Sequence, residues 1–373
     1  MKARILVVDD QPGMLRAVQR VLGPRHSVAS FTSAREALAS ATRLEPDLAI
    51  LDIRLPDIDG FELLGRLKRT VPGLDAILMT GSMTDVDQKV IRSIRENAFY
   101  FIQKPFDSEL LRTLVERCLE QRALREQNRA HIRRLQDELS EARAFQQSLL
   151  PPAEATVAGV ALSCRLRPCT ELAGDLYDYA LCGGGRAAMM VADVSGHGGS
   201  AAMLTGLVKS SFHGAIGGGQ APEAVAAAIA SALGPFGPGR FVTLICLCVD
   251  AAAGRIDYVN AGHPPGILWG DSRPAVELPP TGPIVSPALD GASWVRRSVP
   301  AGPGDRWLLY TDGLTEASTD HAFFGDQRLR DVVRRHPQGG APLLEGLLAA
   351  ETEFRAGRPP ADDLTLLAAV LTG

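Results

Sequence analysis

The sequence lacks several features that mark membrane, secreted and nucleic-acid-binding proteins. No apolar run approaches the roughly 18 residues that a membrane-spanning helix needs. The six cysteines form no CxxC pair, so a disulfide framework is not indicated. The formal net charge of −4 gives no general attraction to nucleic acid or acidic membranes, and no helix-turn-helix pattern is present. We therefore expect a cytoplasmic protein that binds neither DNA nor a membrane.

Glycine and proline are also missing from one long stretch, residues 107–149, which divides the chain. The 373 residues are too many for one typical core, and 46% hydrophobic with 22% charged residues fits ordinary globular protein. Pro151-Pro152 ends the stretch, and the sequence beyond it is rich in Gly, Pro and Ala. We expect a globular domain over 1–120, a helical linker over 121–152 and a second globular domain over 153–373.

Short apolar runs alternate with helical patterns in the first domain. Helical spacing is found over 14–22 and 61–67, between runs that are apolar on both faces. This alternation favours a doubly wound parallel sheet, which binds ligands beyond the carboxyl ends of its strands. The expected strands are Ile5–Val8, Leu48–Leu51, Ala76–Met79 and Phe99–Ile102, with His26–Ser30 as a weaker one.

Polar side chains follow these strands and should meet at one sheet edge. Asp9 and Asp10 follow the first strand, and Asp52, Thr80 and Lys104 follow the third, fourth and fifth. Three carboxylates at one edge repel each other, and a hard divalent cation is the usual compensation. Asp52 can then attack a phosphoryl group whose oxygens Lys104 and Thr80 contact. The alternative is that Asp9 and Asp10 only cap a helix.

This part of the chain resembles the receiver domain of two-component response regulators, a flavodoxin-like fold. The shared motifs are VVDD at 7–10, LDIRLPDIDG at 51–60, MTG at 79–81 and KPF at 104–106. The resemblance implies that Asp52 accepts phosphate from a histidine kinase while Asp9, Asp10 and Asp52 hold Mg²⁺. It also implies that Phe101, which would otherwise be read as a core residue, moves with Thr80.

The stretch 107–149 carries an imperfect heptad pattern. Its two rows are apolar at both ends and polar in the middle, which favours a coiled coil and a homodimer formed through this helix. A solvated single helix is the alternative. The rows are Leu111, Cys118, Arg125, Ile132 and Leu139, and Leu114, Gln121, Asn128, Leu135, Ala142 and Leu149. A change at the phosphorylated Asp52 would travel along this helix to the second domain.

A hairpin in the second domain brings two acids together. Gly184 is the middle residue of the turn signal Gly-Gly-Gly. Asp175 lies nine residues before Gly184, and Asp193 lies nine residues after it. A hairpin folded there sets the two carboxylates opposite each other, roughly 5 Å apart between Cβ atoms. The strands expected in this α+β domain are Leu176–Leu181, Arg186–Val191, Phe241–Val249, Ile256–Asn260, Arg306–Tyr310 and Leu364–Val370; helical patterns lie at 200–215, 222–233 and 342–355.

Two further acidic positions follow or precede strands of this domain. Asp312 comes directly after Arg306–Tyr310, and Asp362 comes just before Leu364–Val370. If these strands are antiparallel neighbours, their acids meet at one edge. Four or five acids gathered there suit two Mg²⁺ or Mn²⁺ ions, which can activate water for in-line attack on phosphorus. Any one of these Asp residues taken alone is more often simple turn chemistry.

The second domain resembles the PPM superfamily of type 2C-like phosphatases, in its SpoIIE/RsbU-like bacterial branch, an αββα sandwich. The motifs are AGDLYD at 173–178, VADVSGHG at 191–198, FVTL at 241–244, NAGHPP at 260–265, YTDGLTEA at 310–317 and ADDLTLL at 361–367. The resemblance implies that Asp193 bridges two metal ions. Asp312 and Asp362 would complete one metal site, and Asp175 with the backbone carbonyl of Val194 the other.

The roles of three further residues stay open, as does the type of output. Asp178, Asp363 and His197 are candidates for an outer layer around the metals, although a hydrogen-bonded loop histidine is the simpler interpretation for His197 and for His263. The resemblance implies dephosphorylation of a phosphoserine or phosphothreonine protein, often an anti-anti-sigma factor of the STAS type in partner switching. A phosphatase fold that only binds a partner, under control of Asp52 phosphorylation, is the alternative.

Overall fold

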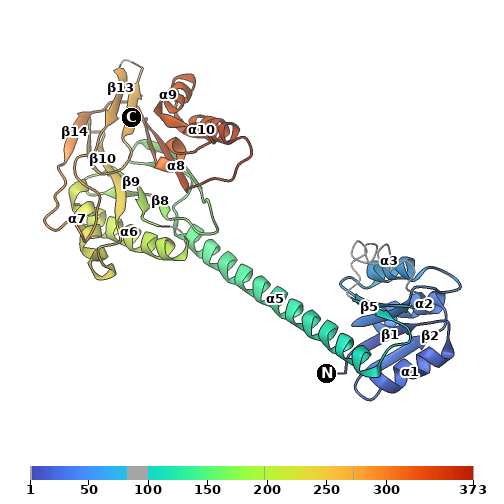
Figure 1. Cartoon of the computed structure of the whole chain (residues 1–373). Coiled ribbons are helices and arrows are strands. Elements are labelled where there is room, and N and C mark those ends of the chain that lie inside the picture. Colours follow the sequence, from blue (N-terminus) through green and yellow to red (C-terminus); the bar gives the residue numbers. More distant parts are fainter. Residues whose placement is uncertain (1, 82–99, 197, 272, 373) are drawn as a thin grey trace. The chain divides into compact units, whose positions relative to one another are not determined.

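The computed structural model describes residues 2–81, 100–196, 198–271 and 273–372. The chain divides into two compact units, Met1–Leu135 and Gln136–Gly373. Each unit has its own apolar core. The labelled helices and strands of both units can be followed in Figure 1. Among the described residues, no helix combines the length and the apolar character that crossing a bilayer would require.

The first unit is a five-stranded parallel sheet in the order β2-β1-β3-β4-β5. Its strands are β1 (Arg4–Val8), β2 (Ser27–Phe31), β3 (Leu48–Asp52), β4 (Asp75–Thr80) and β5 (Tyr100–Gln103). Its helices include α1 (Pro12–Leu22), α2 (Ala34–Leu44) and α3 (Gly60–Thr70). Successive residues of β1 enter opposite cores, Leu6 on one face and Val7 on the other, because side chains alternate along a strand. The predicted doubly wound sheet is confirmed.

One uninterrupted helix, α5 (Ser108–Leu149), follows this sheet, as the missing Gly and Pro predicted. Its first turns bury Leu111, Val115 and Cys118 in a core of the first unit. The apolar heptad residues further along, such as Ile132 and Leu139, are exposed. That exposure fits both a coiled-coil partner face and a solvated helix, so the homodimer stays a prediction.

The second unit contains two antiparallel sheets. The first has the order β14-β11-β10-β9-β8 and the second β13-β12-β15-β16-β7-β6. The first sheet consists of β8 (Asp175–Cys182), β9 (Arg186–Val194), β10 (Val242–Asp250), β11 (Arg255–Ala261) and β14 (Arg297–Pro300). The second consists of β6 (Glu154–Val157), β7 (Val160–Arg167), β12 (Gly266–Gly270), β13 (Arg273–Leu278), β15 (Arg306–Tyr310) and β16 (Leu364–Leu371). The helices are α6 (Gly199–Gly217), α7 (Pro222–Leu233), α8 (Asp312–Thr315), α9 (Gly325–Arg335) and α10 (Gly340–Arg355), with a 3₁₀ turn at Gly234–Phe236.

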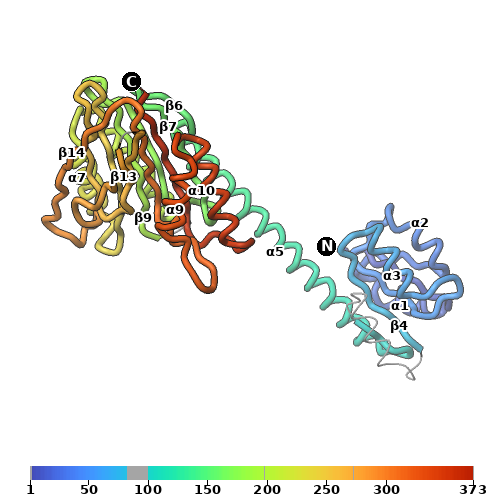
Figure 2. Tube along the Cα trace, turned by 90° about the horizontal axis from the view of Figure 1, so that it is seen from above, coloured from blue at the N-terminus to red at the C-terminus, as the bar shows by residue number. Residues whose placement is uncertain are grey.

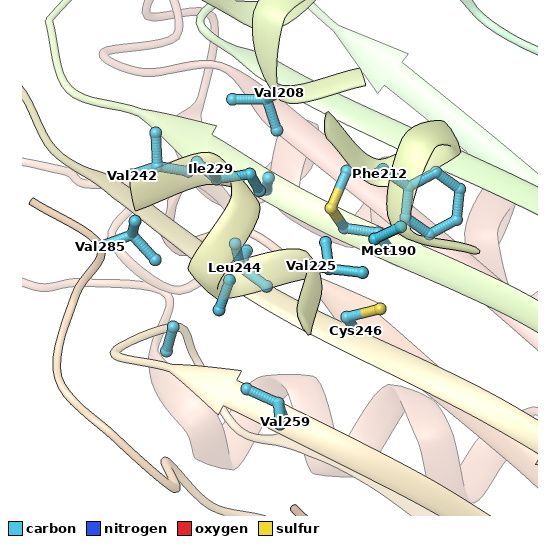
Figure 3. Packing of buried hydrophobic residues seen from close by; sticks show 14 of the residues in the cluster. Met190, Val208, Phe212, Val225, Ile229, Val242, Leu244, Cys246, Val259 and Val285 are labelled. Carbon is cyan, nitrogen blue, oxygen red and sulfur yellow. The ribbon is translucent and has the colours of Figure 1, made fainter. Parts of the chain in front are cut away.

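Three apolar cores separate the four layers of this unit. Phe212 of α6 and Ile229 of α7 pack against the first sheet, which Figure 3 shows at close range. Trp307 lies in the core between the two sheets. Leu344 of α10 and Leu329 of α9 pack on the outer face of the second sheet, and the same layers can be followed in Figure 2. This arrangement is the αββα sandwich that the resemblance implied.

Several elements of this sandwich lie outside the predicted strands and helices. The strands β6, β7, β12, β13 and β14 and the helix α9 were not predicted. β7 is the clearest case, because it is paired on both sides, with β16 and with β6. Its sequence VALSCRLR mixes apolar and charged residues, so the pairing partners define this strand more than its own pattern does.

Candidate functional sites

The first candidate site lies at the carboxyl edge of the parallel sheet. Asp9, Asp10 and Asp52 each bring a carboxylate oxygen within 4.8 Å of the others. Lys104 lies among them, with its Nζ 2.5 Å from Asp9 Oδ2 and 2.8 Å from Asp52 Oδ2. The backbone amide of Lys104 donates to the carbonyl of Thr80 at 2.7 Å, which fixes the end of β5 beside β4. The predicted meeting of these residues at one edge is therefore found.

The charges at this edge are only partly balanced. Burial raises the pKa of Asp9 above its usual value, although the hydrogen bond from Lys104 opposes that effect. Burial alone would lower the pKa of Lys104, but its hydrogen bonds to Asp52 and Asp9 outweigh burial and raise it. One ammonium thus faces three close carboxylates. Their oxygen atoms are the donors that Mg²⁺ prefers, so the residues fit such an ion.

The two residues expected to switch lie next to this edge. Thr80 is the last residue of β4, and Phe101 lies on the neighbouring strand β5. Both are half-buried, and the Phe101 ring lies 6.3 Å from that of Phe61 on α3, measured between centroids. Phe101 therefore borders the core without being enclosed by it, and its coupled movement with Thr80 stays a prediction.

The second candidate site begins with the β8–β9 hairpin. Asp175 pairs directly with Asp193 across the two strands, as the position of the glycine turn predicted. Directly opposite residues in an antiparallel pair point to the same face, so both carboxylates lie on one side of the sheet. Thr243 of β10 is the cross-strand neighbour of Asp193 on its other side.

The second sheet brings its own acids to the same place. β15 and β16 are antiparallel neighbours, as expected, with Tyr310 opposite Leu366. Asp312 opens α8, with Thr311 between it and the end of β15. The hydroxyl of Thr311 donates to Asp175 Oδ2 at 2.7 Å, which ties the end of β15 to the start of β8 on the other sheet.

Burial and mutual repulsion both raise the pKa of these acids. Burial raises the pKa of Asp193 to about 7, and the charges of Asp312, Asp362 and Asp363 add to that rise. Burial also raises the pKa of Asp175, followed by the charge of Asp193, against hydrogen bonds from threonines that lower it. The pKa of Asp312 is raised by burial and then by Asp362. Divalent cations would relieve this repulsion, and the carboxylate set fits them.

The acids of this site are spread over some distance. The tight group of the second unit, with ligand atoms within 4.8 Å, is Cys169, Asp362 and Asp363, and in the described part of the chain no three of the four predicted ligands lie that close. Two ions roughly 3.5–4 Å apart distribute their ligands over a wider area than one ion does. The spacing therefore suits a pair of ions better than a single ion.

The adjacent acids Asp362 and Asp363 differ in their surroundings. Asp363 is buried, and its two oxygens accept from the amides of Cys169 at 2.8 Å and Gly174 at 2.6 Å. Asp362 is exposed, and its Oδ1 accepts from the amide of Asp363 at 2.8 Å. Asp363 thus holds a loop in place, whereas Asp362 keeps oxygen lone pairs free for a metal.

The remaining candidate residues of this site are Asp178, Val194 and His197. Asp178 is buried and accepts from Lys209 Nζ at 2.5 Å, and its Oδ2 lies 3.0 Å from His213 Nε2, so it ties β8 to α6. Val194 is buried, and its backbone amide donates to Gly174. His197 lies outside the described residues.

His263 is a fully buried loop histidine beside the site. Its Nδ1 lies 2.7 Å from the hydroxyl of Thr243, and its amide donates to Asn260 Oδ1 at 2.8 Å. Burial lowers the pKa of His263 to about 3, which keeps the ring neutral. These contacts fit the interpretation of a hydrogen-bonded loop residue.

Thr311 and Thr243 were not singled out from the sequence, although both lie inside the motifs YTDGLTEA and FVTL.

Comparisons with known proteins find relatives of both units. The family model described as response regulator receiver domain matches residues 5–116. Phosphoserine phosphatase RsbP of Bacillus subtilis is 30% identical over 200 residues, which is 52% of this chain and 48% of that protein. Transcriptional regulatory protein GlrR of Escherichia coli is 32% identical over 124 residues, 32% of this chain and 27% of that protein. The chain thus spans about a quarter to a half of the length of these relatives.

Solved structures and a second family model concern the second unit. The SiaA-PP2C domain of Pseudomonas aeruginosa is 25% identical with a TM-score of 0.56, covering 65% of this chain and 98% of that one. The RsbU and RsbW domains of Rv1364c from Mycobacterium tuberculosis are 25% identical with a TM-score of 0.51, covering 59% and 62%. The model described as Stage II sporulation protein E (SpoIIE) matches residues 183–372. The chain belongs to the SpoIIE family of PPM-type phosphatase domains, with a response regulator receiver domain before it.

Proposed function

We propose that this protein is a response regulator whose output is a metal-dependent phosphoserine and phosphothreonine protein phosphatase. The observation that carries the proposal is the acid cluster of the second unit. Asp175 and Asp193 pair across one hairpin, and burial together with the charges of Asp312, Asp362 and Asp363 raises the pKa of Asp193 to about 7. Such a cluster is costly without bound cations, so a binding role explains it better than a structural one.

The phosphatase residues have distinct tasks in this proposal. Asp193, Asp312 and Asp362 would hold one Mn²⁺ or Mg²⁺ ion, and Asp175, Asp193 and the carbonyl of Val194 the other. When bound, two such ions supply positive charge to the phosphoryl oxygens and lower the pKa of water. Thr311 keeps the Asp175 carboxylate oriented through its 2.7 Å hydrogen bond. Asp363 holds the loop before Asp175 through two backbone amides.

The receiver residues would carry a phosphoryl group delivered by a histidine kinase. Asp52 is the nucleophile, since its carboxylate ends a strand and lies next to Asp9 and Asp10, which would hold Mg²⁺ with it. Attack by an Asp52 oxygen forms a new P–O bond as the bond from phosphorus to the kinase histidine nitrogen breaks. Lys104 then pairs with the phosphoryl oxygens, and the Thr80 hydroxyl donates to one of them.

A phosphorylated STAS-type protein is the substrate class we propose, in a partner-switching pathway. The support is the similarity to RsbP, whose name is that of a phosphoserine phosphatase, over about half of this chain. A phosphatase fold that only binds its partner is the second candidate. The retention of Asp175, Asp193, Asp312 and Asp362 together favours the enzyme, because a pure binding module has no need of all four acids.

Release of phosphate from a phosphoserine STAS protein tests this proposal. The full chain should release phosphate only when Mn²⁺ or Mg²⁺ is added. Asp193→Asn should lower the rate by about a hundredfold or more, since it removes the acid shared by both ions. Asp326→Asn, which changes an exposed acid on α9, is the matched control and should leave the rate unchanged. No phosphate release by wild type with metal bound would contradict the enzyme and favour the binding module. A metal-independent rate, or equal measurable rates for wild type and Asp193→Asn, would contradict the metal-dependent site.

A further inference from the structure

The end of α5 makes an unusual contact with the phosphatase core of its own unit. The carboxamide of Gln146 bonds both backbone groups of a single residue, Ala173. Its Nε2 donates to the Ala173 carbonyl at 2.7 Å, and its Oε1 accepts from the Ala173 amide at 3.0 Å. The same Nε2 lies 3.4 Å from the hydroxyl of Thr205 on α6. Two bonds from one carboxamide fix both the position and the rotation of the Ala173 peptide groups.

The loop that Gln146 contacts is also held by Asp363, the residue directly before β16. Gly174, directly after Ala173, donates its amide to Asp363 Oδ2 at 2.6 Å. Cys169, at the start of the loop, donates its amide to Asp363 Oδ1 at 2.8 Å. The peptide group between Ala173 and Gly174 is therefore held at both ends, its carbonyl by Gln146 and its amide by Asp363. Asp175 is the next residue in the chain.

A further contact supports the same connection. Arg143, one turn before Gln146, pairs with Glu171 of the loop at 3.6 Å. Gln146, Thr205 and Asp175 also line a common small cavity, so the helix end and the candidate metal ligand lie against the same space. The exposed Arg143–Glu171 pair contributes little by itself. The neutral, half-buried carboxamide is the stronger of the two contacts.

We propose that Gln146 is a positioning residue for Asp175, so that the last turns of α5 are part of the machinery that sets a metal ligand. The inference rests on the proposed function, because it takes Asp175 as a ligand. Without the carboxamide, the amide and the carbonyl of Ala173 lose their partner, while Gly174 keeps its bonds to Asp363 and to the Val194 amide. The Asp175 carboxylate then samples more orientations. Groups that orient metal ligands typically change metal affinity by about 10–100-fold when removed.

Calorimetric titration of the full chain with Mn²⁺ tests the inference. All chains carry Asp9→Asn and Asp10→Asn, so that the receiver acids do not contribute to binding. Gln146→Ala should weaken Mn²⁺ binding about tenfold. Gln147→Ala, which changes the exposed neighbouring glutamine, is the matched control and should bind as the parent does. Gln146→Glu keeps an acceptor for the Ala173 amide and loses the donor, so it should fall between parent and Gln146→Ala, and it replaces Gln146→Ala if that variant fails to fold.

Hydrogen exchange of the segment 168–176 gives a second readout in the same chains. The Ala173 amide should be protected in the parent and in Gln147→Ala, and should exchange faster in Gln146→Ala. Unchanged Mn²⁺ affinity in Gln146→Ala would overturn the inference, provided that Asp175→Asn binds more weakly than the parent. If the parent binds no Mn²⁺, or Asp175→Asn binds as tightly as the parent, the proposed function itself fails.

Discussion

At the scale of single residues, the second unit uses threonine hydroxyls to keep a buried carboxylate ready for a cation. Thr311 Oγ1 donates to Asp175 Oδ2, and the amide of Thr365 donates to Thr311 Oγ1 at 2.9 Å. Burial raises the pKa of Asp175, and these threonines oppose that rise. The carboxylate thus remains better suited to metal binding than its burial alone would allow.

Replacing Thr311 with valine should expose this role. The change keeps the shape of the side chain and removes the donor, so the pKa of Asp175 rises further and Mn²⁺ binding weakens by about tenfold. Calorimetry on the full chain is the measurement. Thr156→Val, on the exposed side of β6, provides the control and should bind as wild type does. An unchanged affinity in Thr311→Val would mean that the hydroxyl does not orient Asp175.

His263 should make the stability of this unit depend on pH. Its pKa is about 3 in the fold and about 6.5 in an unfolded chain, so the unfolded state binds one more proton between these values. The stability that the neutral ring contributes is therefore present above about pH 6.5 and is lost as pH falls. His263→Gln removes this loss. The unfolding free energy of the variant minus that of wild type should therefore be about 2 kcal/mol higher at about pH 5.0 than at about pH 7.5.

Urea denaturation at the two pH values measures this difference. The exposed His321, changed to Gln, serves as the control and should keep the same stability relative to wild type at both. A His263→Gln difference that does not vary with pH would show that the ring is not held neutral in the fold.

At the scale of elements, the approach of the 169–174 loop to β9 leaves no room for a side chain at Gly174. A Cβ there would lie 2.9 Å from the carbonyl oxygen of Val194 and 3.2 Å from that of Gly196. Because these are backbone atoms, they cannot turn aside as a flexible side chain would. The carbonyl of Val194 is also one of the proposed metal ligands, so a shift there affects the site as well as the packing.

Gly174→Ala should therefore lower both the free energy of unfolding and the affinity for Mn²⁺. We expect a loss of about 1–3 kcal/mol in unfolding free energy, as for other overpacked sites. Gly206→Ala in α6, where a Cβ meets nothing within 4 Å, is the matched control and should stabilise the helix by up to about 1 kcal/mol. Chemical denaturation and calorimetry report the two effects. A Gly174→Ala chain as stable as wild type would show that the loop has room to move.

The features that could be predicted from the sequence are those that depend on residues close together in the chain. The register of Asp175 with Asp193 followed from the position of the glycine turn and the two-residue period of a strand. The pattern of the residues alone does not separate Asp362 from Asp363, and only the family resemblance assigned them different roles, because their physical difference arises when the 169–174 loop folds against one of them. Gln146 gave no signal either, since a glutamine in a polar helix looks the same whether it contacts solvent or a peptide group.

At the scale of the whole molecule, the receiver and the SpoIIE-type domain are joined by one chain segment, α5 (Ser108–Leu149). The division between the two compact units falls within this helix, after Leu135. The contact of Gln146 with Ala173 gives the last turns of the helix a place beside the phosphatase acids. We therefore expect α5 to be the element through which a change in the receiver affects the phosphatase acids.

Phosphatase activity with and without beryllofluoride tests the control of one domain by the other. Beryllofluoride mimics the phosphoryl group on Asp52, so adding it to wild type with Mg²⁺ should change the rate of phosphate release from a phosphoserine STAS protein. Asp52→Ala removes the acceptor, so its rate should not respond. Equal wild-type rates with and without beryllofluoride, matching those of Asp52→Ala, would contradict the account that receiver phosphorylation controls the phosphatase.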